Sequence, residues 1–281
     1  MIKVRELQFS YTKQPFIENM SFDVQSGEIF GFLGPSGAGK STLQKILTGL
    51  LTAYTGSVMV NGAEAKYHVS SFYEDIGVDF EFSSLYEKLT ARENLRFFAS
   101  LYKRHQAIDP LLESVGLLAD ADKKAAAFSK GMKARLNFIK ALLHDPMLLF
   151  LDEPTSGLDP SNARNMKNMI LREKAKGKTI LLTTHNMYDA TELCDRVAFI
   201  VDGRLRALDS PRNLIMSRGA SKVRYTYSLN GGEEQAEIPL DRTGNDNVLQ
   251  RLIRENRLLS IHSSEPTLND IFVELTGRRL Q

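Results

Sequence analysis

The sequence predicts an α/β fold with a helical insertion and a small α+β unit at its C-terminal end. The first observation is the continuous apolar run "PMLLFLDEP" (146–154), which is typical of a parallel strand buried on both faces. The second is the glycine-rich stretch "GPSGAGKST" (34–42), which lies between a predicted strand and a predicted helix. The third is a change in pattern beyond about residue 217, which predicts a domain over 1–217 and an accessory unit over 218–281.

The N-terminal quarter reads mostly as strands. "IKVRELQFSY" (2–11) alternates in polarity, and "MSFDVQSGEIFGFLG" (20–34) predicts two short strands about a turn at 25–27. An apolar helix is expected from Lys40 to about Leu50, followed by the strand "GSVMVNG" (56–62).

The middle of the chain predicts a helical part and then further α/β alternation. From about 83 to 144 the pattern is mostly helical, and "ARENLRFFASLYKRH" (91–105) is its clearest amphipathic piece. After the strand in 146–154 we expect a helix, a strand, a helix and a hairpin, near 160–175, 178–185, 187–194 and 196–208.

The accessory unit has its own predicted elements. "KVRYTYSLNGGEEQAEIPL" (222–240) indicates a hairpin that turns at 230–232. A helix near 246–256, a strand near 257–262 and a helix capped by Thr267 with Asp270 complete it.

Composition narrows the class of protein. The 281 residues are 42% hydrophobic and 25% charged with a net charge of +2, so no strong field favours nucleic acid and none is expected as a partner. A single cysteine, Cys194, excludes an internal disulfide and suits a reducing compartment. The start "MIKVRELQF" lacks the apolar core of a signal peptide, and no uncharged apolar run approaches the roughly 18 residues that span a bilayer. We therefore expect a soluble chain.

The glycine-rich stretch predicts a phosphate cradle. It matches G-x-x-x-x-G-K-[ST], in which the backbone bends so that N–H groups point at phosphate oxygens. Lys40 would place its charge on the β and γ phosphates and Ser41 its hydroxyl on Mg²⁺, so ATP and Mg²⁺ are the expected cofactors. The alternative is an ordinary glycine-rich turn. The predicted nucleotide contacts in this stretch are Gly34, Pro35, Ser36, Gly37, Ala38, Gly39, Lys40, Ser41 and Thr42.

Two acids end the buried apolar run. Asp152 is expected to hold Mg²⁺ through water, and Glu153 to take a proton from, or orient, an attacking water. The alternative is a strand that ends in two solvated acids, as in many α/β proteins.

A second predicted anion site lies in "FSKGMKARL" (128–136). The N-terminus of a helix presents spare N–H groups, and Lys130, Lys133 and Arg135 stand beside it. The alternative is an amphipathic helix capped by Ser129. That reading predicts a buried stripe of Met132, Leu136, Ile139 and Leu143, and a solvated face of Lys133, Asn137 and Lys140.

Together with "SGLD" (156–159) and "TTH" (183–185), these motifs resemble the ATP-binding cassettes of ABC transporters over residues 1–217. The resemblance implies a P-loop NTPase cassette with a RecA-like parallel sheet core, an antiparallel β subdomain and a helical subdomain over about 83–144. In that family one subunit's signature helix meets the nucleotide held by another. Ser129 and Gly131 would therefore contact the ATP of a second, identical cassette.

The resemblance also implies roles for residues whose types alone are uninformative. His185 would contact the γ-phosphate and Asp159 would cross the dimer interface, although each also fits a structural role at a strand end or a helix cap. Tyr11 would stack on adenine, with Phe16 as the fallback ring and strand packing as the alternative. At the family's glutamine position this chain has Glu81, which we expect to sense Mg²⁺ unless it merely faces solvent.

Without membrane spans, such a cassette needs a separate permease. In the family, the region around Glu81 is where the permease docks. Phe80 just before it, and Phe82 and Tyr86 after it, are the aromatic residues that we expect to anchor the permease. The "SKGMKARL" form and the ending "EPTLNDIFVELTG" resemble ABC-2-type exporters, so we expect a cytoplasmic subunit on the inner face of the membrane that powers export. The alternative is a soluble ATPase of the same superfamily that acts on DNA or ribosomes.

Overall fold

The computed structural model describes residues 1–67, 70–80, 84–218, 222–229, 231–264 and 266–277. The chain divides into two compact units, one over Met1–Ser210 and one that begins at Pro211. The sequence places the boundary after residue 217, which falls inside helix α7 (Pro211–Arg218). Because α7 packs against α9 (Leu268–Thr276), it belongs with the second unit.

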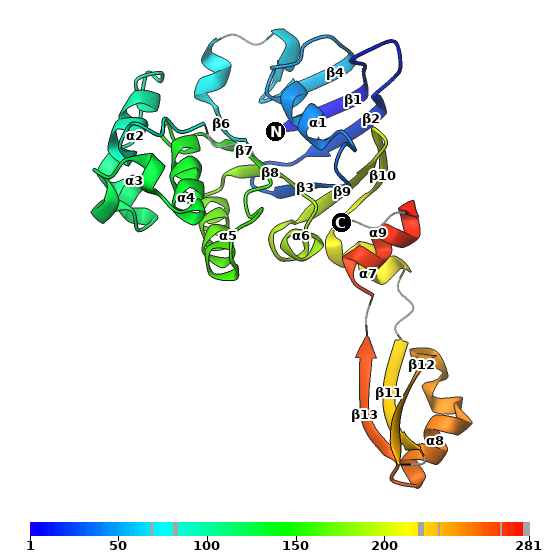
Figure 1. Cartoon of the computed structure of the whole chain (residues 1–281). Helices are drawn as coiled ribbons and strands as arrows, with labels where there is room; N and C mark the ends of the chain where they lie inside the picture. Colours follow the sequence, from blue (N-terminus) through cyan, green and yellow to red (C-terminus); the bar gives the residue numbers. More distant parts are fainter. Residues whose placement is uncertain (68–69, 81–83, 219–221, 230, 265, 278–281) are drawn as a thin grey trace. The chain divides into compact units, whose positions relative to one another are not determined.

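The first unit contains the predicted parallel sheet (Figure 1). Its strand order is β10-β9-β3-β8-β7-β6, in which all neighbours are parallel except the edge pair β9 and β10. The strands are β3 (Ile29–Leu33), β6 (Ile76–Asp79), β7 (Leu148–Asp152), β8 (Thr179–Thr184), β9 (Arg196–Val201) and β10 (Arg204–Asp209). Strands β3, β7 and β8 are buried along their whole length, and for β7 the apolar run at 146–154 predicts this burial.

An antiparallel sheet of order β2-β1-β4-β5 provides the predicted β subdomain. Its strands are β1 (Ile2–Phe9), β2 (Ile17–Val24), β4 (Tyr54–Val60) and β5 (Ala63–Glu64). One face of this sheet shares a core with the parallel sheet, in which the rings of Phe22 and Phe32 meet edge-on at 5.3 Å between centroids. The antiparallel sheet and one face of the parallel sheet therefore share a hydrophobic core.

Helices surround the sheets of the first unit, and α2–α4 gather beyond the β6 edge in Figure 1. The predicted helical part contains α2 (Ala91–Ala99), α3 (Ile108–Ser114) and α4 (Lys130–Ala141) with short 3₁₀ turns at Leu118–Asp120 and Ala125–Ala127. The remaining helical segments are α1 (Lys40–Leu47), α5 (Pro160–Ala175), α6 (Met187–Leu193) and 3₁₀ turns at Ala65–Tyr67 and Ser70–Glu74.

The predicted polarity of α4 is partly wrong. Leu136, Ile139 and Leu143 are buried as expected, but Met132 of the predicted stripe is only half-buried. Asn137, which is predicted on the solvated face, is only 5% exposed. Lys140 is also partly covered, with its ammonium 5.0 Å from the centre of the Phe98 ring of α2. Helix α4 is packed on two sides because α2 and α3 lie against it.

The second unit is a small α+β fold, as predicted. A sheet of order β12-β11-β13 is formed by β11 (Lys222–Leu229), β12 (Gly232–Pro239) and β13 (Leu258–Ser264). A 3₁₀ turn (Leu240–Asn245) and α8 (Asn247–Arg254) follow the hairpin, and Val223, Tyr225, Leu249 and Leu252 form the core. Thr267 and Asp270 form a complete capping box at the start of α9, as the sequence predicts.

In the part of the chain that the structure describes, no helix combines the length and the apolar character that a membrane span requires.

Candidate nucleotide-binding site

The glycine-rich loop joins the end of β3 to the start of α1, as its motif requires. Gly34 has no room for a side chain, because a Cβ there would lie 2.1 Å from the carbonyl oxygen of Ile200. Gly39 precedes α1 with φ +109°. In this left-handed conformation a residue with a side chain would be strained. Among the described residues, the N–H groups of Gly37 and Gly39 have no acceptor. The loop thus presents free donors at a helix N-terminus, which is an anion-binding arrangement.

Lys40 is buried and folded over this loop. Its Nζ donates to the carbonyl oxygens of Gly34 at 2.7 Å and Pro35 at 3.1 Å. These contacts hold the ammonium at the same loop whose N–H groups are free. A phosphate bound there would therefore meet a cation that is already in place.

Tyr11 lies beside the first turn of α1. Its hydroxyl is 3.0 Å from the hydroxyl of Thr42, and its ring contacts those of Phe9 and Phe16 edge-on. The ring remains 56% exposed, so a flat surface is available next to the cradle. This placement agrees with the predicted adenine contact, which stays a prediction.

The two acids and the histidine meet at adjoining strand ends. Strands β7 and β8 pair in parallel with Asp152 opposite Thr183, whose hydroxyl donates to the Asp152 carboxylate. Glu153 and His185 are the first residues after β7 and β8, and His185 Nδ1 lies 2.9 Å from Glu153 Oε1. The sheet therefore brings together two residues that are 32 positions apart in the sequence.

Glu153 has a strained backbone. Its φ is +50°, which is uncommon for a residue with a side chain. Its N–H donates to the carbonyl oxygen of Thr183 at 3.0 Å, which fixes one side of the residue. Strain of this kind persists only where surrounding contacts enforce it, and such residues concentrate at functional sites.

All these groups lie at one edge of the sheet. Strands β3, β8 and β7 are neighbours and parallel, so the residues that follow them emerge at the same carboxyl edge. Ligands of open α/β sheets bind at this edge. The phosphate cradle, His185 and the pair Asp152–Glu153 are thereby assembled from three separate loops.

The second predicted anion site is the N-terminus of α4. Ser129 caps the helix by accepting a hydrogen bond from the N–H of Met132 at 3.2 Å, as the capping alternative predicts, and a cap and an anion site can share one helix end. Gly131 is buried, and a Cβ there would lie 2.5 Å from Cγ of Asn162 on α5. The amide of Asn162 donates to Asp159 at 2.5 Å, and Asp159 caps α5.

A further contact joins the same two segments. Gly157 has φ +62°, and the ammonium of Lys130 fills the space where its side chain would be. Lys130–Gly157 and Gly131–Asn162 therefore pack the start of α4 onto the loop that contains Asp159. Sequence reasoning did not predict this contact within one chain, because nothing in either short motif indicates the other as a neighbour.

The donor set fits Mg²⁺ better than a metal with an all-protein site. In the described ranges no group of three or more His, Cys, Asp or Glu residues could hold a metal ion. Mg²⁺ is commonly held by one or two protein oxygens together with waters and substrate phosphates. The Ser41 hydroxyl and the Asp152 carboxylate are such oxygens. Glu81 lies outside the described residues, so its predicted role stays a prediction.

Asp79 is a buried acid that the sequence analysis missed. It ends β6, the strand next to β7, and is 8% exposed. Burial raises its pKa to about 7, with Asp152 adding to the shift and Lys140 opposing it. Asp79 and Glu153 both line a cavity of about 330 Å³ with residues of α4. The sequence signal that could have identified Asp79 is an acid at the end of a predicted parallel strand, as at Asp152.

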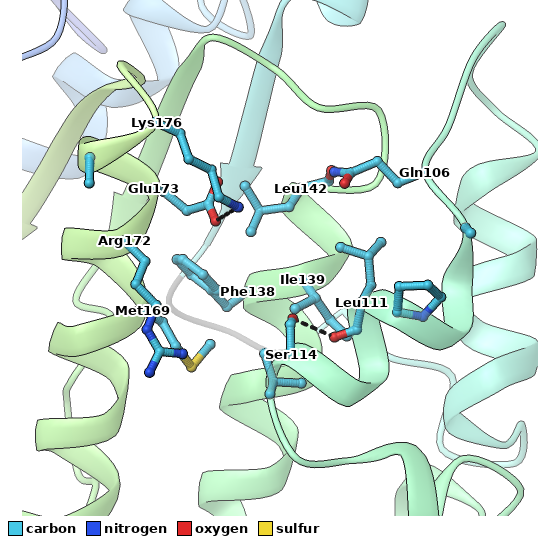
Figure 2. Close-up of a pocket in the computed structure, with 14 residues that line it drawn as sticks. Gln106, Leu111, Ser114, Phe138, Ile139, Leu142, Met169, Arg172, Glu173 and Lys176 are labelled. Atoms are coloured by element: carbon cyan, nitrogen blue, oxygen red, sulfur yellow. Dashed lines mark hydrogen bonds and ion pairs between the residues drawn. The ribbon is translucent and has the colours of Figure 1, made fainter.

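A larger cavity, of about 510 Å³, lies apart from the predicted residues (Figure 2). Leu111 of α3, Ile139 of α4 and Met169 of α5 line it, so it separates the helical part from α5. Two of its polar lining residues are already bonded, since Ser114 donates to the carbonyl oxygen of Leu111 and Lys176 to Glu173. None of the predicted nucleotide contacts reaches it.

Comparison with known proteins decides the family. The family model described as ABC transporter matches residues 17–156. The fluoroquinolones export ATP-binding protein of Mycobacterium tuberculosis is 52% identical over 285 residues, which cover 100% of this chain and 94% of that protein. The chain belongs to the ABC transporter family. It is an ATP-binding subunit, and hydrolysis of ATP is the reaction that such a subunit catalyses.

Other relatives support the same assignment for the whole cassette. The Nod factor export ATP-binding protein I of Rhizobium meliloti (strain 1021) is 36% identical, covering 100% of this chain and 89% of that protein. The linearmycin resistance ATP-binding protein of Bacillus subtilis is 30% identical over the full length of both chains. Because these alignments span both units, the C-terminal unit of the cassette is shared with exporters.

Solved structures confirm the predicted fold. An ATP-binding subunit of an ABC transporter superposes with a TM-score of 0.70 at 32% identity, covering 77% of this chain and 92% of that one. The cbiO1 subunit from Clostridium perfringens gives a TM-score of 0.69 at 25% identity, with 77% and 90% coverage. ATP as a ligand is thereby confirmed at the family level, whereas Mg²⁺ and the individual site residues remain predictions.

Proposed function

We propose that the cassette pairs head to tail with an identical copy and powers export through a separate membrane permease. The observation that carries the proposal is the Glu153–His185 pair, whose 2.9 Å contact lies at the sheet edge where the phosphate cradle also emerges. The relatives named as export proteins support the direction of transport. They also argue against the alternative role on DNA or ribosomes.

Each residue of the proposed site has a distinct role in ATP hydrolysis. The free N–H groups of the cradle and the ammonium of Lys40 bind the β and γ phosphates. Ser41 and Asp152 would hold Mg²⁺, which supplies positive charge that stabilises the transferred phosphoryl group. Glu153 accepts a proton from the attacking water, and its contact with His185 keeps the carboxylate pointed at that water.

The second anion site gives each chain a role in its partner's reaction. Ser129 and Gly131 stand at the start of α4, which is anchored to the Asp159 loop rather than to the cradle loop after β3. We infer that this helix end meets the γ-phosphate held by the facing copy. Its field contributes only about 0.3–1 kcal/mol at an exposed surface but more once water is excluded between two subunits.

Replacing Glu153 with Gln tests the reaction directly. The amide keeps the size of the side chain but cannot accept the proton, so hydrolysis should fall by about 100-fold or more while ATP binding persists. The variant should then accumulate as an ATP-dependent dimer, measured by light scattering with size-exclusion chromatography. Adding Lys40→Ala should abolish that dimer. Normal hydrolysis by the Gln variant would remove Glu153 from the proposed role.

An exposed aromatic cluster is the proposed permease-docking surface, at the inner face of the membrane. The ring of Tyr86 is 49% exposed and meets Phe97 of α2 at 4.9 Å. Asn94, which is fully buried, fixes the backbone of Tyr86 on both sides by accepting from its N–H and donating to its carbonyl. Of the other predicted anchors, Phe80 is 38% exposed and Phe82 lies outside the described residues.

We expect Tyr86→Ala with Phe97→Ala to weaken recovery of the co-expressed permease on an affinity-tagged cassette. Rigid exposed aromatics commonly contribute more than 1 kcal/mol to an interface, so recovery should fall several-fold while ATP binding stays unchanged. Replacing Tyr188, which is 78% exposed on α6, is a matched control that should leave recovery unchanged. Equal recovery with and without the Tyr86–Phe97 cluster would place the permease elsewhere.

A further inference from the structure

Asp189 of α6 stands in a buried contact that the proposed reaction does not use. It is 6% exposed, and its carboxylate accepts a hydrogen bond from the hydroxyl of Thr155 at 2.6 Å. Lys167 of α5 approaches the same carboxylate at 3.3 Å and also bonds Glu192. Burial alone would lower the pKa of Lys167, but its hydrogen bonds to Glu192 and Asp189 outweigh that effect and raise it. The buried carboxylate is therefore paired with a permanent cation.

Each member of this contact follows a different part of the site. Thr155 lies two residues after Glu153, and Asp189 lies four residues after His185. Lys167 lies on α5, the helix that Asp159 caps. The contact of Thr155, Asp189 and Lys167, which we call the Asp189 node, thus joins the three chain segments that leave the reaction site.

The strained backbone of Glu153 must be maintained by contacts on both sides of the residue, and the Asp189 node provides one of them. On its N-terminal side Glu153 is fixed by the β7–β8 ladder and by the bond from its N–H to Thr183. On its C-terminal side its carbonyl oxygen accepts from the N–H of Ser156 at 3.0 Å, and the Thr155 hydroxyl is the first side-chain bond that ties this turn to another segment. A residue at φ +50° can relax if either side is released.

His185 is fixed in the same way from its own C-terminal side. Asn186 caps α6 by accepting from the N–H groups of Tyr188 and Asp189. Asp189 then fastens that first turn to Thr155 and to α5. Without this fastening, α6 is a short helix whose start, and with it His185, can shift relative to Glu153.

We propose that Asp189 is a positioning residue that sets the Glu153–His185 contact by tying the loop after Glu153 to the helix after His185. Asp189 is buried and lies outside the predicted nucleotide contacts, so it acts through the pair. The inference rests on the roles proposed above for Glu153 and His185.

Thr155→Val in the full chain is the most selective test, because valine keeps the shape but removes the donor to Asp189. We expect kcat for ATP to fall about tenfold, while KM and nucleotide affinity change by less than about twofold, since the cradle is untouched. Thr155→Ser keeps the hydroxyl and should restore most of the turnover. If valine does not fit, Thr155→Ala removes the same hydroxyl without adding atoms.

A double-mutant cycle separates positioning from loss of stability. In a His185→Ala background the pair no longer exists, so Thr155→Val should lower the residual turnover by less than about twofold. Thr179→Val is the matched control, because Thr179 is a fully buried threonine at the opposite end of β8 whose hydroxyl accepts from the N–H of Gly27. It should lower the melting temperature but not the kcat of the folded protein.

The outcomes distinguish this inference from the proposed function. The positioning role alone would be overturned if Thr155→Val lowered kcat by the same factor in the wild-type and His185→Ala backgrounds. It would also be overturned if Thr155→Val kept the wild-type kcat while His185→Ala was impaired. Wild-type hydrolysis by Glu153→Gln and His185→Ala would instead overturn the reaction assigned to the pair.

Discussion

Glu153 shows what a single residue contributes and what it requires. Its position after a buried strand identifies the acid, but its proposed role also involves a left-handed backbone and a histidine that follows the neighbouring strand. The position of Lys40 depends on local contacts instead, because its ammonium donates to Gly34 in the same glycine-rich loop that forms the predicted phosphate site. The sequence is therefore sufficient to identify the cradle, whereas the reaction pair depends on the sheet.

Asp79 permits a prediction about pH. Its folded pKa of about 7 lies above the ordinary value of about 3.9, so the unfolded chain releases this proton first as the pH rises. The free energy of unfolding should therefore decrease between about pH 4 and pH 7 and change no further above that range through this group.

Asp79→Asn removes this titration. The free energy of unfolding of the variant minus that of the wild type should increase from pH 5 to pH 8 by on the order of 1–3 kcal/mol. Denaturant unfolding at both pH values measures this difference. A difference that is the same at pH 5 and pH 8 would show that Asp79 does not titrate as a buried acid.

At the scale of elements, α4 connects the helical part to the site. Most of its buried stripe was predictable from spacing, but the partial exposure of Met132 and the burial of Asn137 were not, because the sequence does not show how many neighbours a helix has. Its first turn packs on the Asp159 loop through Gly131 and Asn162. The two motifs that we propose to face a partner copy are therefore adjacent within one chain.

Gly131→Ala tests this contact between elements. The added Cβ would lie 2.5 Å from Asn162, so we expect about 1–3 kcal/mol of destabilisation in chemical unfolding. Asn162→Ala removes the obstructing side chain, and the double variant should be less destabilised than the sum of the two single changes. Additive losses would mean that Gly131 is required for another reason.

At the scale of the whole molecule, the proposed arrangement gives each chain two half-sites, so it predicts that activity belongs to the pair. Each copy provides a cradle for its own nucleotide and, in the proposed arrangement, a helix end for its partner's. Turnover per chain should accordingly rise with protein concentration.

Mixing two defective chains tests that arrangement. Lys40→Ala removes the cradle cation, and Ser129→Ala with Gly131→Ala damages the helix end, so each homodimer should be nearly inactive. A mixed dimer contains one intact site, and random pairing should restore about a quarter of the wild-type rate at saturating concentration. An equimolar mixture that stays as inactive as its components would contradict head-to-tail sharing.

Local sequence by itself determined the elements whose stabilising contacts lie within a few residues. The cradle, the Asp159 cap and the Thr267–Asp270 capping box each depend on bonds between near neighbours, so their residue types and spacing were enough. The family motifs added the order of the segments.

Only the tertiary structure decided which distant segments meet. Glu153 with His185, Gly131 with Asn162, and Thr155 with Asp189 are pairs whose contact depends on strand order and helix packing. The unit boundary at residue 210 was decided in the same way, by the packing of α7 against α9. The physical reason is that such contacts require the chain to close long loops around a common core, and short-range spacing carries no information about which loops will close.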